Sequence, residues 1–312
     1  VNDMTDKHPK RMKRIIDDKI EDFCSEYPEG DAGRRQDLEP CYIRNGGIYS
    51  MKRDTLINDF TRHGEDSRPY VKVVGTPSTG VNHLNVNYLK DKEIDFYSLL
   101  DDRESLETIT ASAEFTWIHI MNSFRGFSNS LKSVNDWRES NNESSLRFRE
   151  LSGKNIGIIG FGRIGKKVKR YAEAFDMNVK FYDPYVDGGC SSIDDLYDSD
   201  VLSINCYLND ETKNMVSNGF LDGFKDGLVV VNTSRGEVVD ENYISKFVKD
   251  KKIFYSCDVL QNEQDIKSLK NSPLYELNKN NHPNLVITPH VAGVSVDSQR
   301  KALEIILKLC MK

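Results

Sequence analysis

The 312 residues of the chain suggest two domains, which excludes a peptide or a single small module. Asp and Glu total 49 against 43 Lys and Arg, so the net charge of −6 offers no basic surface to nucleic acid or anionic lipid. No apolar stretch approaches the roughly 18 residues of a membrane span, and charged residues stand where a signal peptide would have its apolar core. We therefore predict a folded, cytoplasmic protein with no nucleic-acid and no membrane partner.

The six cysteines form no C-x-x-C pair and have no histidine at metal-ligand spacing. We expect reduced thiols, several of them buried beside strands, and no metal site. The chain begins with Val1 instead of Met, so we expect an upstream portion to be missing.

The first 70 residues differ in sequence pattern from the rest of the chain. Arg11–Ile16 and Lys19–Phe23 flank two aspartates as the arms of a hairpin would. Val71–Val74 and Ile94–Leu99 are strand candidates of a small α/β unit. Apolar residues at steps of three and four then predict one long helix over about 112–131, whose apolar stripe lies in the core or, alternatively, at a subunit interface. The stripe consists of Ala113, Trp117, Ile120, Met121, Phe124, Phe127 and Leu131.

From Asn155 onward, short β-branched runs alternate with amphipathic stretches, which predicts a doubly wound α/β domain with a parallel sheet and crossover helices. A final helix is expected over about 298–312. The six predicted strands are Asn155–Gly160, Val179–Asp183, Val201–Asn205, Leu228–Asn232, Ile253–Asp258 and Leu285–Thr288.

The strongest local motif is Gly160-Phe-Gly162-Arg-Ile-Gly165, which follows the first of these strands and opens a helix. Gly160 permits the tight turn, Gly162 lets a pyrophosphate approach the backbone, and Gly165 lets helix and strand pack closely. Asp183 ends the next strand, where a carboxylate accepts hydrogen bonds from a ribose and repels a 2′-phosphate. The pattern favours NAD, and the alternative is a structural glycine turn with an ordinary surface aspartate.

Polar residues also follow the later strands, at the edge where open α/β sheets bind ligands. Arg235 follows the fourth strand, Asp258 closes the fifth and His290 follows the sixth. Glu263 lies in the connection 261–284, whose length implies a functional or mobile segment. The remaining histidines, His8, His63, His119 and His282, show no partner pattern and are expected to be exposed or packed, and His83 at most supports the site.

A guanidinium, an imidazole and a carboxylate on one rim suit hydride transfer at a carbon that bears a hydroxyl beside a carboxylate. We expect Arg235 to bind the substrate carboxylate and polarise the C2 oxygen, and His290 to exchange the hydroxyl proton. Glu263 would orient the imidazole and raise its pKa. The alternatives are a surface ion pair for Arg235, a helix cap for His290 and a solvated acid for Glu263.

From about Val71 to the C-terminus these motifs resemble the D-isomer-specific 2-hydroxyacid dehydrogenases. Gly-Ile-Ile-Gly-Phe-Gly-Arg-Ile-Gly, Phe-Tyr-Asp-Pro, Asn-Thr-Ser-Arg-Gly, Asp-Val-Leu and Thr-Pro-His-Val-Ala-Gly occur in the family's order and spacing. The resemblance implies NAD as cofactor, a small 2-hydroxy or 2-oxo acid as substrate, and a homodimer formed through the NAD-binding domain. It implies that Arg235, Glu263 and His290 are catalytic. Further cofactor contacts are implied for Arg163, Ile164, Cys206, Thr212, Thr233, Ser234 and Asp258, and backbone contacts to the substrate for Ser78, Thr79 and Gly80.

Three positions depart from the family pattern. Gln264 stands where Pro is common, Asn82 stands where Asp is common, and Asn-Cys-Tyr-Leu at 205–208 replaces His-x-Pro-Leu. The last change is expected to alter the adenine side of the cofactor pocket.

Residues 1–70 are instead similar to the later part of acylneuraminate cytidylyltransferases. That family's nucleotide-binding loop and its metal-binding aspartate segment are absent, so no cytidylyltransferase activity is expected. The similarity lies in His8-Pro-Lys-Arg-Met-Lys, Arg34-Arg-Gln-Asp-Leu, Tyr42-Ile-Arg-Asn-Gly and Arg68-Pro-Tyr-Val.

We predict three parts: a cytidylyltransferase-like segment at 1–71, a partial substrate-binding domain at 72–114 with 291–312, and an NAD-binding domain at 115–290. The leading functional hypothesis is an NAD-dependent D-2-hydroxyacid dehydrogenase. The alternative is an NAD-binding but catalytically impaired composite with an incomplete substrate lobe. A third hypothesis has residues 1–70 binding a nonulosonic sugar or pairing with a cytidylyltransferase.

Overall fold

The computed structural model describes residues 73–81, 84–132 and 146–311, together with short strands at 2–3, 13–16, 19–22 and 42–43. The chain divides into two compact units, Val1–Tyr70 and Val71–Lys312. The assignment of three functional parts to the chain stays a prediction.

In the first unit, β2 (Lys13–Ile16) pairs antiparallel with β3 (Lys19–Asp22), which confirms the predicted hairpin. The strand β1 (Asn2–Asp3) pairs antiparallel with β4 (Tyr42–Ile43). Apart from Lys13 and Tyr42–Ile43, the stretches that resemble cytidylyltransferases lie outside the described residues, as do Asn82, His8, His63 and His83.

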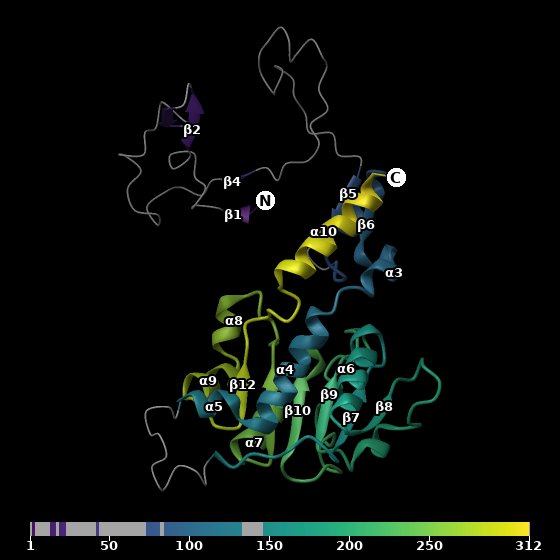
Figure 1. The fold of residues 1–312 in the computed structure, drawn as a ribbon, viewed down its shortest axis with the longest axis vertical. Helices are drawn as coiled ribbons and strands as arrows, with labels where there is room; N and C mark the ends of the chain where they lie inside the picture. Colours follow the sequence, from purple (N-terminus) through teal and green to yellow (C-terminus); the bar gives the residue numbers. More distant parts are fainter. Residues whose placement is uncertain are drawn as a thin grey trace. The chain divides into compact units, whose positions relative to one another are not determined.

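The second unit is built on a six-stranded parallel sheet in the order β12-β11-β10-β9-β7-β8, a Rossmann-like doubly wound fold (Figure 1). Chain order reverses between β7 and β9, which is where such sheets bind ligands. All six predicted strands are confirmed, each to within one residue at either end. They are β7 (Asn155–Ile159), β8 (Asn178–Tyr182), β9 (Val201–Ile204), β10 (Leu228–Asn232), β11 (Ile253–Cys257) and β12 (Leu285–Ile287).

The register brings the carboxyl ends of these strands to one common edge. Ile159 lies opposite both Tyr182 and Ile204, and Asn232 lies opposite both Ile204 and Cys257. The residues that directly follow the strands therefore gather along a single rim, as the sequence predicted.

Strand β10 shows how the sheet is covered on both faces, because its side chains alternate. Val229 and Val231 pack in a core cluster with residues of α4 (Ala111–Arg125) and α6 (Arg163–Ala174). Leu228 and Val230 pack in the opposite cluster, which includes residues of α7 (Glu241–Lys249) and α9 (Pro273–Lys279). Both clusters are fully buried hydrophobic layers, typical of strands covered by helices on each side.

The predicted long helix over 112–131 is wrong in one respect, because it is broken at Gly126 into α4 and α5 (Phe127–Lys132). Gly126 has φ of 57°, and a Cβ there would lie 2.0 Å from the Phe148 ring. Beyond the break the apolar stripe leaves the core: Phe127 is 64% exposed and Leu131 58%. The packed part of the stripe is therefore limited to α4.

The small lobe pairs β5 (Val73–Thr76) in parallel with β6 (Asp95–Ser98), and α10 (Val296–Cys310) lies beside both (Figure 1). Its buried core joins Leu106 to Ile305 and Ile306 of α10. The remaining elements are α2 (Val86–Asp91), α3 (Arg103–Leu106), α8 (Ile266–Lys270) and three 3-10 turns at Leu99–Asp101, Ile193–Leu196 and Gly236–Val238. The long 261–284 connection thus holds α8 and α9. Among the described helices, none has the length and apolar character that crossing a bilayer requires.

Candidate active site

The glycine turn after β7 is shaped by close backbone contacts. Gly160 has φ of 85°, and a Cβ there would lie 2.5 Å from the backbone nitrogen of Cys206, directly beyond β9. A Cβ on Gly165 would lie 2.2 Å from the carbonyl oxygen of Gly160. Any residue other than glycine at position 160 or 165 would therefore push neighbouring backbone atoms aside. The turn therefore draws the ends of β7 and β9 together at the reversal point of the sheet.

Gly162, in contrast, borders open space, since nothing described lies within 4 Å of the position its Cβ would take. It is the N-cap of α6, and no side chain caps that helix end. The first-turn N–H groups of a helix have no partner within the helix and carry a partial positive charge. The turn thus offers an open, donor-rich cradle to an anion such as pyrophosphate.

Asp183 follows β8 and is tied to the same turn. One carboxylate oxygen accepts the Phe161 N–H at 2.7 Å, and the other accepts the Tyr185 N–H at 3.0 Å. Phe161 is in turn stacked on Phe181, with ring centroids 3.6 Å apart. The carboxylate is therefore held at the strand end next to the cradle, where it can still accept hydrogen bonds from ribose hydroxyls.

The other predicted cofactor residues line the same rim but are engaged in internal contacts. Burial raises the pKa of the Cys206 thiol to about 11, so it stays protonated near neutral pH. Thr212 donates to the Tyr207 carbonyl oxygen at 2.6 Å and so closes the loop after β9. The Thr233 hydroxyl lies 2.6 Å from that of Thr116.

Ser234 and Arg163 also use their side chains within the protein. The Ser234 hydroxyl donates to Asn232 at 2.8 Å, and the Arg163 guanidinium donates to the Ile109 carbonyl at 2.6 Å. Ile164 packs partly buried against the core. What Arg163 and Ile164 can offer a cofactor is therefore the backbone at the start of α6, as the resemblance implies.

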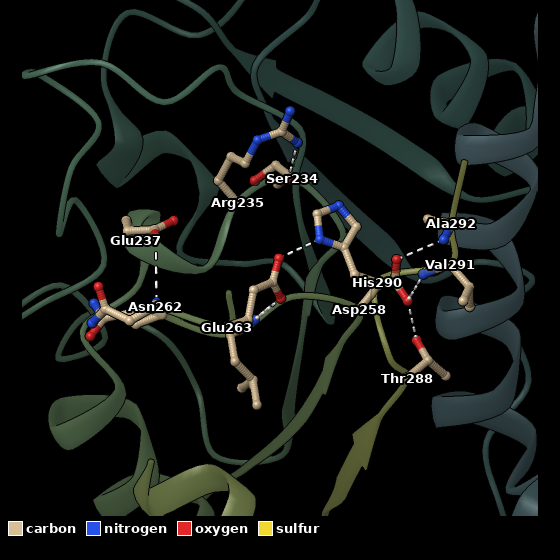
Figure 2. Close-up of polar contacts among 12 residues, drawn as sticks. Ser234, Arg235, Glu237, Asp258, Asn262, Glu263, Thr288, His290, Val291 and Ala292 are labelled. Atoms are coloured by element: carbon tan, nitrogen blue, oxygen red, sulfur yellow. Dashed lines mark hydrogen bonds and ion pairs between the residues drawn. The ribbon is translucent and has the colours of Figure 1, made fainter. Parts of the chain in front are cut away.

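His290 and Glu263, distant in sequence, form a hydrogen-bonded pair through His290 Nδ1 and Glu263 Oε1 (Figure 2). The second carboxylate oxygen of Glu263 accepts the Leu260 N–H at 3.0 Å. The bond to Glu263 raises the pKa of His290 above its usual value, and burial opposes that shift only in part. The His290 side chain remains 49% exposed. It is thus a base with a raised pKa that solvent or a ligand can reach.

Arg235 faces the same space from the end of β10. In Figure 2 its guanidinium lies above the His290 ring, whereas Glu263 lies below and to the left of it. One guanidinium nitrogen donates to the Ser234 carbonyl at 2.7 Å, and another lies 3.1 Å from where a Gly80 Cβ would stand. The predicted substrate loop is therefore beside Arg235, and Ser78 accepts the Gly80 N–H at 3.1 Å within it.

Asp258 organises the turn that carries His290. Its buried carboxylate accepts the N–H groups of Val291 at 3.0 Å and Ala292 at 2.7 Å, and the hydroxyl of Thr288 at 2.5 Å (Figure 2). The His290 N–H donates to the Asp258 carbonyl at 2.8 Å. His290 adopts φ of 53°, a left-handed conformation that costs a non-glycine residue about 1–2 kcal/mol. These bonds hold the strained turn in place.

His119, which showed no partner pattern in the sequence and was expected to be exposed or packed, is packed and has two hydrogen-bond partners. His119 is only 3% exposed on α4, and its ring nitrogens lie 2.7 Å from the Ser256 hydroxyl and 3.0 Å from that of Thr288. Burial lowers its pKa to about 4. The available signal was its place in the series Thr116, His119 and Ser123, polar residues at helical spacing among apolar ones.

The parallel sheet, the glycine turn and the strand-end carboxylate together define a dinucleotide-binding domain. The family model of D-isomer specific 2-hydroxyacid dehydrogenases, NAD binding domain, matches residues 117–292, more than half of the chain. The chain belongs to this family. It therefore contains an NAD-binding domain, and the open cradle at Gly162 and the carboxylate of Asp183 fit that cofactor.

Individual proteins agree with the family assignment. A hydroxypyruvate reductase of Thermotoga maritima is 31% identical over 180 residues, which are 54% of this chain and 55% of that protein. The crystal structure of a D-lactate dehydrogenase from Aquifex aeolicus, complexed with NAD and lactic acid, is 30% identical with a TM-score of 0.65, covering 76% of this chain and 74% of that one.

A dehydrogenase of the family from Lactobacillus delbrueckii, solved with NAD, shares the fold at 24% identity and a TM-score of 0.66, covering 77% of this chain and 75% of that one. The chain spans only a little more than half the length of the sequence relatives it matches.

Proposed function

We propose that the protein is an NAD-dependent oxidoreductase that transfers a hydride between NAD and C2 of a small D-2-hydroxy acid or 2-oxo acid. The observation that carries the proposal is the Glu263–His290 pair facing Arg235 across an accessible space, on the same sheet edge as the glycine turn. Membership of the family and the relatives that act on hydroxypyruvate and lactic acid support it.

The proton chemistry follows from the pair. During oxidation of a hydroxyl, neutral His290 takes its proton, and during reduction of a carbonyl the imidazolium returns it. Glu263 accepts from Nδ1, which leaves Nε2 as the nitrogen that serves the substrate, and its negative charge stabilises the imidazolium. NAD, when bound, supplies the hydride acceptor, and NADH the donor.

Substrate binding is assigned to groups on both sides of this space. The planar fork of Arg235 matches a carboxylate, and its charge also polarises a C2 carbonyl oxygen for attack. Gly80 lies next to that guanidinium, and the backbone of its loop, Ser78, Thr79 and Gly80, would hold the other carboxylate oxygen. Asp258, Thr233 and Ser234 would then lie on the nicotinamide side, and Cys206 and Thr212 on the adenine side.

The test is oxidation of NADH, followed by absorbance, across a panel of small 2-oxo acids. Turnover with at least one of them, lost in Arg235→Ala, is expected. If no member of the panel is reduced and Arg235→Ala behaves like the wild type, the proposed activity is wrong. The same protein should be titrated with NADH by fluorescence, so that cofactor binding is measured apart from turnover.

A second candidate is an NAD-binding protein without turnover. It is favoured by the small lobe, whose described part pairs only two parallel strands. Two-stranded parallel pairing is weak on its own. Tight NADH binding with no reduction of any 2-oxo acid would select this candidate.

We also propose that the NAD-binding domain forms a homodimer. The support is the apolar side chains of Phe127 and Leu131, which lie exposed on α5 of that domain. Light scattering should give twice the mass of the chain, and Leu131→Ser should reduce it. The predicted cytoplasmic location stays a prediction.

A further inference from the structure

The buried face of α4 carries three polar side chains at Thr116, His119 and Ser123. The hydroxyls of Thr116 and Ser123 each donate to the carbonyl four residues earlier on the helix, at 2.7 and 2.8 Å. Only His119 uses both its polar atoms across the boundary between helix and sheet. It contacts Ser256 on β11 and Thr288 directly after β12.

The direction of every hydrogen bond in this group follows from a count of protons. Asp258 as a carboxylate can only accept, so the single hydroxyl proton of Thr288 lies in its bond to Asp258. Thr288 must then accept from His119, which places the ring proton on Nε2. Since burial lowers the pKa of His119 to about 4, Nδ1 is unprotonated near neutral pH and accepts from Ser256.

The chain of bonds therefore runs from Ser256 through His119 and Thr288 to Asp258. It ends at the carboxylate that receives the N–H groups of Val291 and Ala292, the two residues after the strained His290 position. The Nε2–H of His119 occupies the acceptor side of the Thr288 hydroxyl and so helps to fix its proton in the bond to Asp258. A change at His119 would thus reach the His290 turn through three successive hydrogen bonds.

We propose that His119 is a positioning residue for His290. As the Nε2–H tautomer it orients the Thr288 hydroxyl toward Asp258, and thereby holds the turn that presents His290 to Glu263. The role of His290 as acid and base rests on the proposed function, but the positioning does not. The tests are therefore chosen to succeed or fail separately from turnover.

The first test is nitrogen-15 NMR of the histidine side chains in the intact protein. His119 should show one protonated and one unprotonated ring nitrogen throughout pH 5 to 8, with Nε2 protonated, whereas His290 should titrate above its usual value of about 6.5. A His119 ring protonated on Nδ1, or one that titrates with His290, would overturn the proposal.

The second test compares His119→Leu with Ile120→Val, a substitution of a fully buried neighbour on α4 whose apolar side chain takes part in none of these hydrogen bonds. His119→Leu should lower the pKa of His290 toward its usual value and lower kcat about tenfold, with KM little changed. Ile120→Val should leave both unchanged. An unaltered His290 titration in His119→Leu would contradict the positioning role even if the protein reduces no 2-oxo acid.

Three further variants separate positioning from folding. His119→Leu leaves the buried Ser256 hydroxyl unpaired, so the double variant with Ser256→Ala is measured as well and should fold with the same His290 shift. His119→Gln, whose amide can donate to Thr288, should restore the His290 titration in part. Combining His119→Leu with Thr288→Val should lower kcat and the pKa of His290 no further than either change alone, because both changes break the same series of hydrogen bonds. Additive losses would show that the residues act independently.

Discussion

The glycine turn after β7 and the His290 turn after β12 lie on the same sheet edge but are built in opposite ways. In the glycine turn the backbone itself makes the site: Gly160 takes φ of 85° against the backbone of Cys206, and Gly162 leaves open space. In the His290 turn a non-glycine residue holds φ of 53° because the side chain of Asp258 ties down the neighbouring N–H groups. The first turn requires that Gly160 and Gly165 carry no side chain, whereas the second depends on the side chain of Asp258.

Replacing the imidazole should have the largest effect on turnover. His290→Gln removes the proton-transfer group, so kcat should fall about 10²- to 10⁴-fold. NADH affinity, measured by fluorescence titration, should stay within about twofold, because the glycine turn is untouched. Retention of wild-type kcat would remove His290 from the proposed mechanism.

Three glycine substitutions should separate the demands on the first turn. Gly160→Ala should lose both thermal stability and NADH binding, because its Cβ would overlap the Cys206 backbone. Gly162→Ala should keep its melting temperature yet weaken NADH binding at least tenfold, because the methyl group fills the cradle. Gly153→Ala is the matched control: φ is 72° with nothing near the Cβ, so it should lose about 1–2 kcal/mol of stability and no affinity.

These three variants are measured by thermal unfolding and by NADH fluorescence. Equal losses of affinity in Gly153→Ala and Gly162→Ala would mean that the open side of Gly162 does not serve the cofactor.

Glu263→Gln should alter how the stability of the protein and its rate of 2-oxo acid reduction depend on pH. The pKa of His290 is raised in the folded protein, so the Glu263–His290 pair stabilises the fold fully below about pH 6.5 and loses that contribution as pH rises through the raised pKa. Reduction of a 2-oxo acid needs the imidazolium and should decline over the same rise in pH. In Glu263→Gln the decline should begin at lower pH, and kcat should fall about tenfold.

The shift is measured from the pH profile of kcat for 2-oxo acid reduction. NMR titration of His290 gives an independent readout. Arg300→Gln, which removes an exposed ion pair with Asp297 on α10, serves as a charge control and should leave the profile unchanged. An unshifted profile in Glu263→Gln would contradict the assigned partnership.

The smallest expected effect is at Asp183. Asp183→Ser removes the charge that repels a 2′-phosphate, so the preference for NADH over NADPH should narrow about tenfold, as measured by the ratio of the two dissociation constants. Lys180→Met on the same strand, which removes an exposed bond to Asp198, should leave the ratio unchanged. A constant ratio in Asp183→Ser would show that another group selects the cofactor.

Periodicity predicted the sheet well because its strands are buried on both faces and read as short β-branched runs between turns. The same logic failed at Gly126, where an apolar stripe continued past a left-handed residue that ends the helix. The pairing of Glu263 with His290 was predicted, although the intervening connection folds into α8 and α9, helices the sequence analysis did not anticipate.

The parallel sheet, the position of the glycine turn and the order in which polar residues reach the common edge could all be predicted from the sequence. These follow from local patterns, since strands, helix starts and glycine conformations depend on nearby residues. The contacts of His119, in contrast, depend on how α4 packs against the sheet. Its two partners lie 137 and 169 residues away, and only packing α4 against β11 and β12 brings their hydroxyls to its ring.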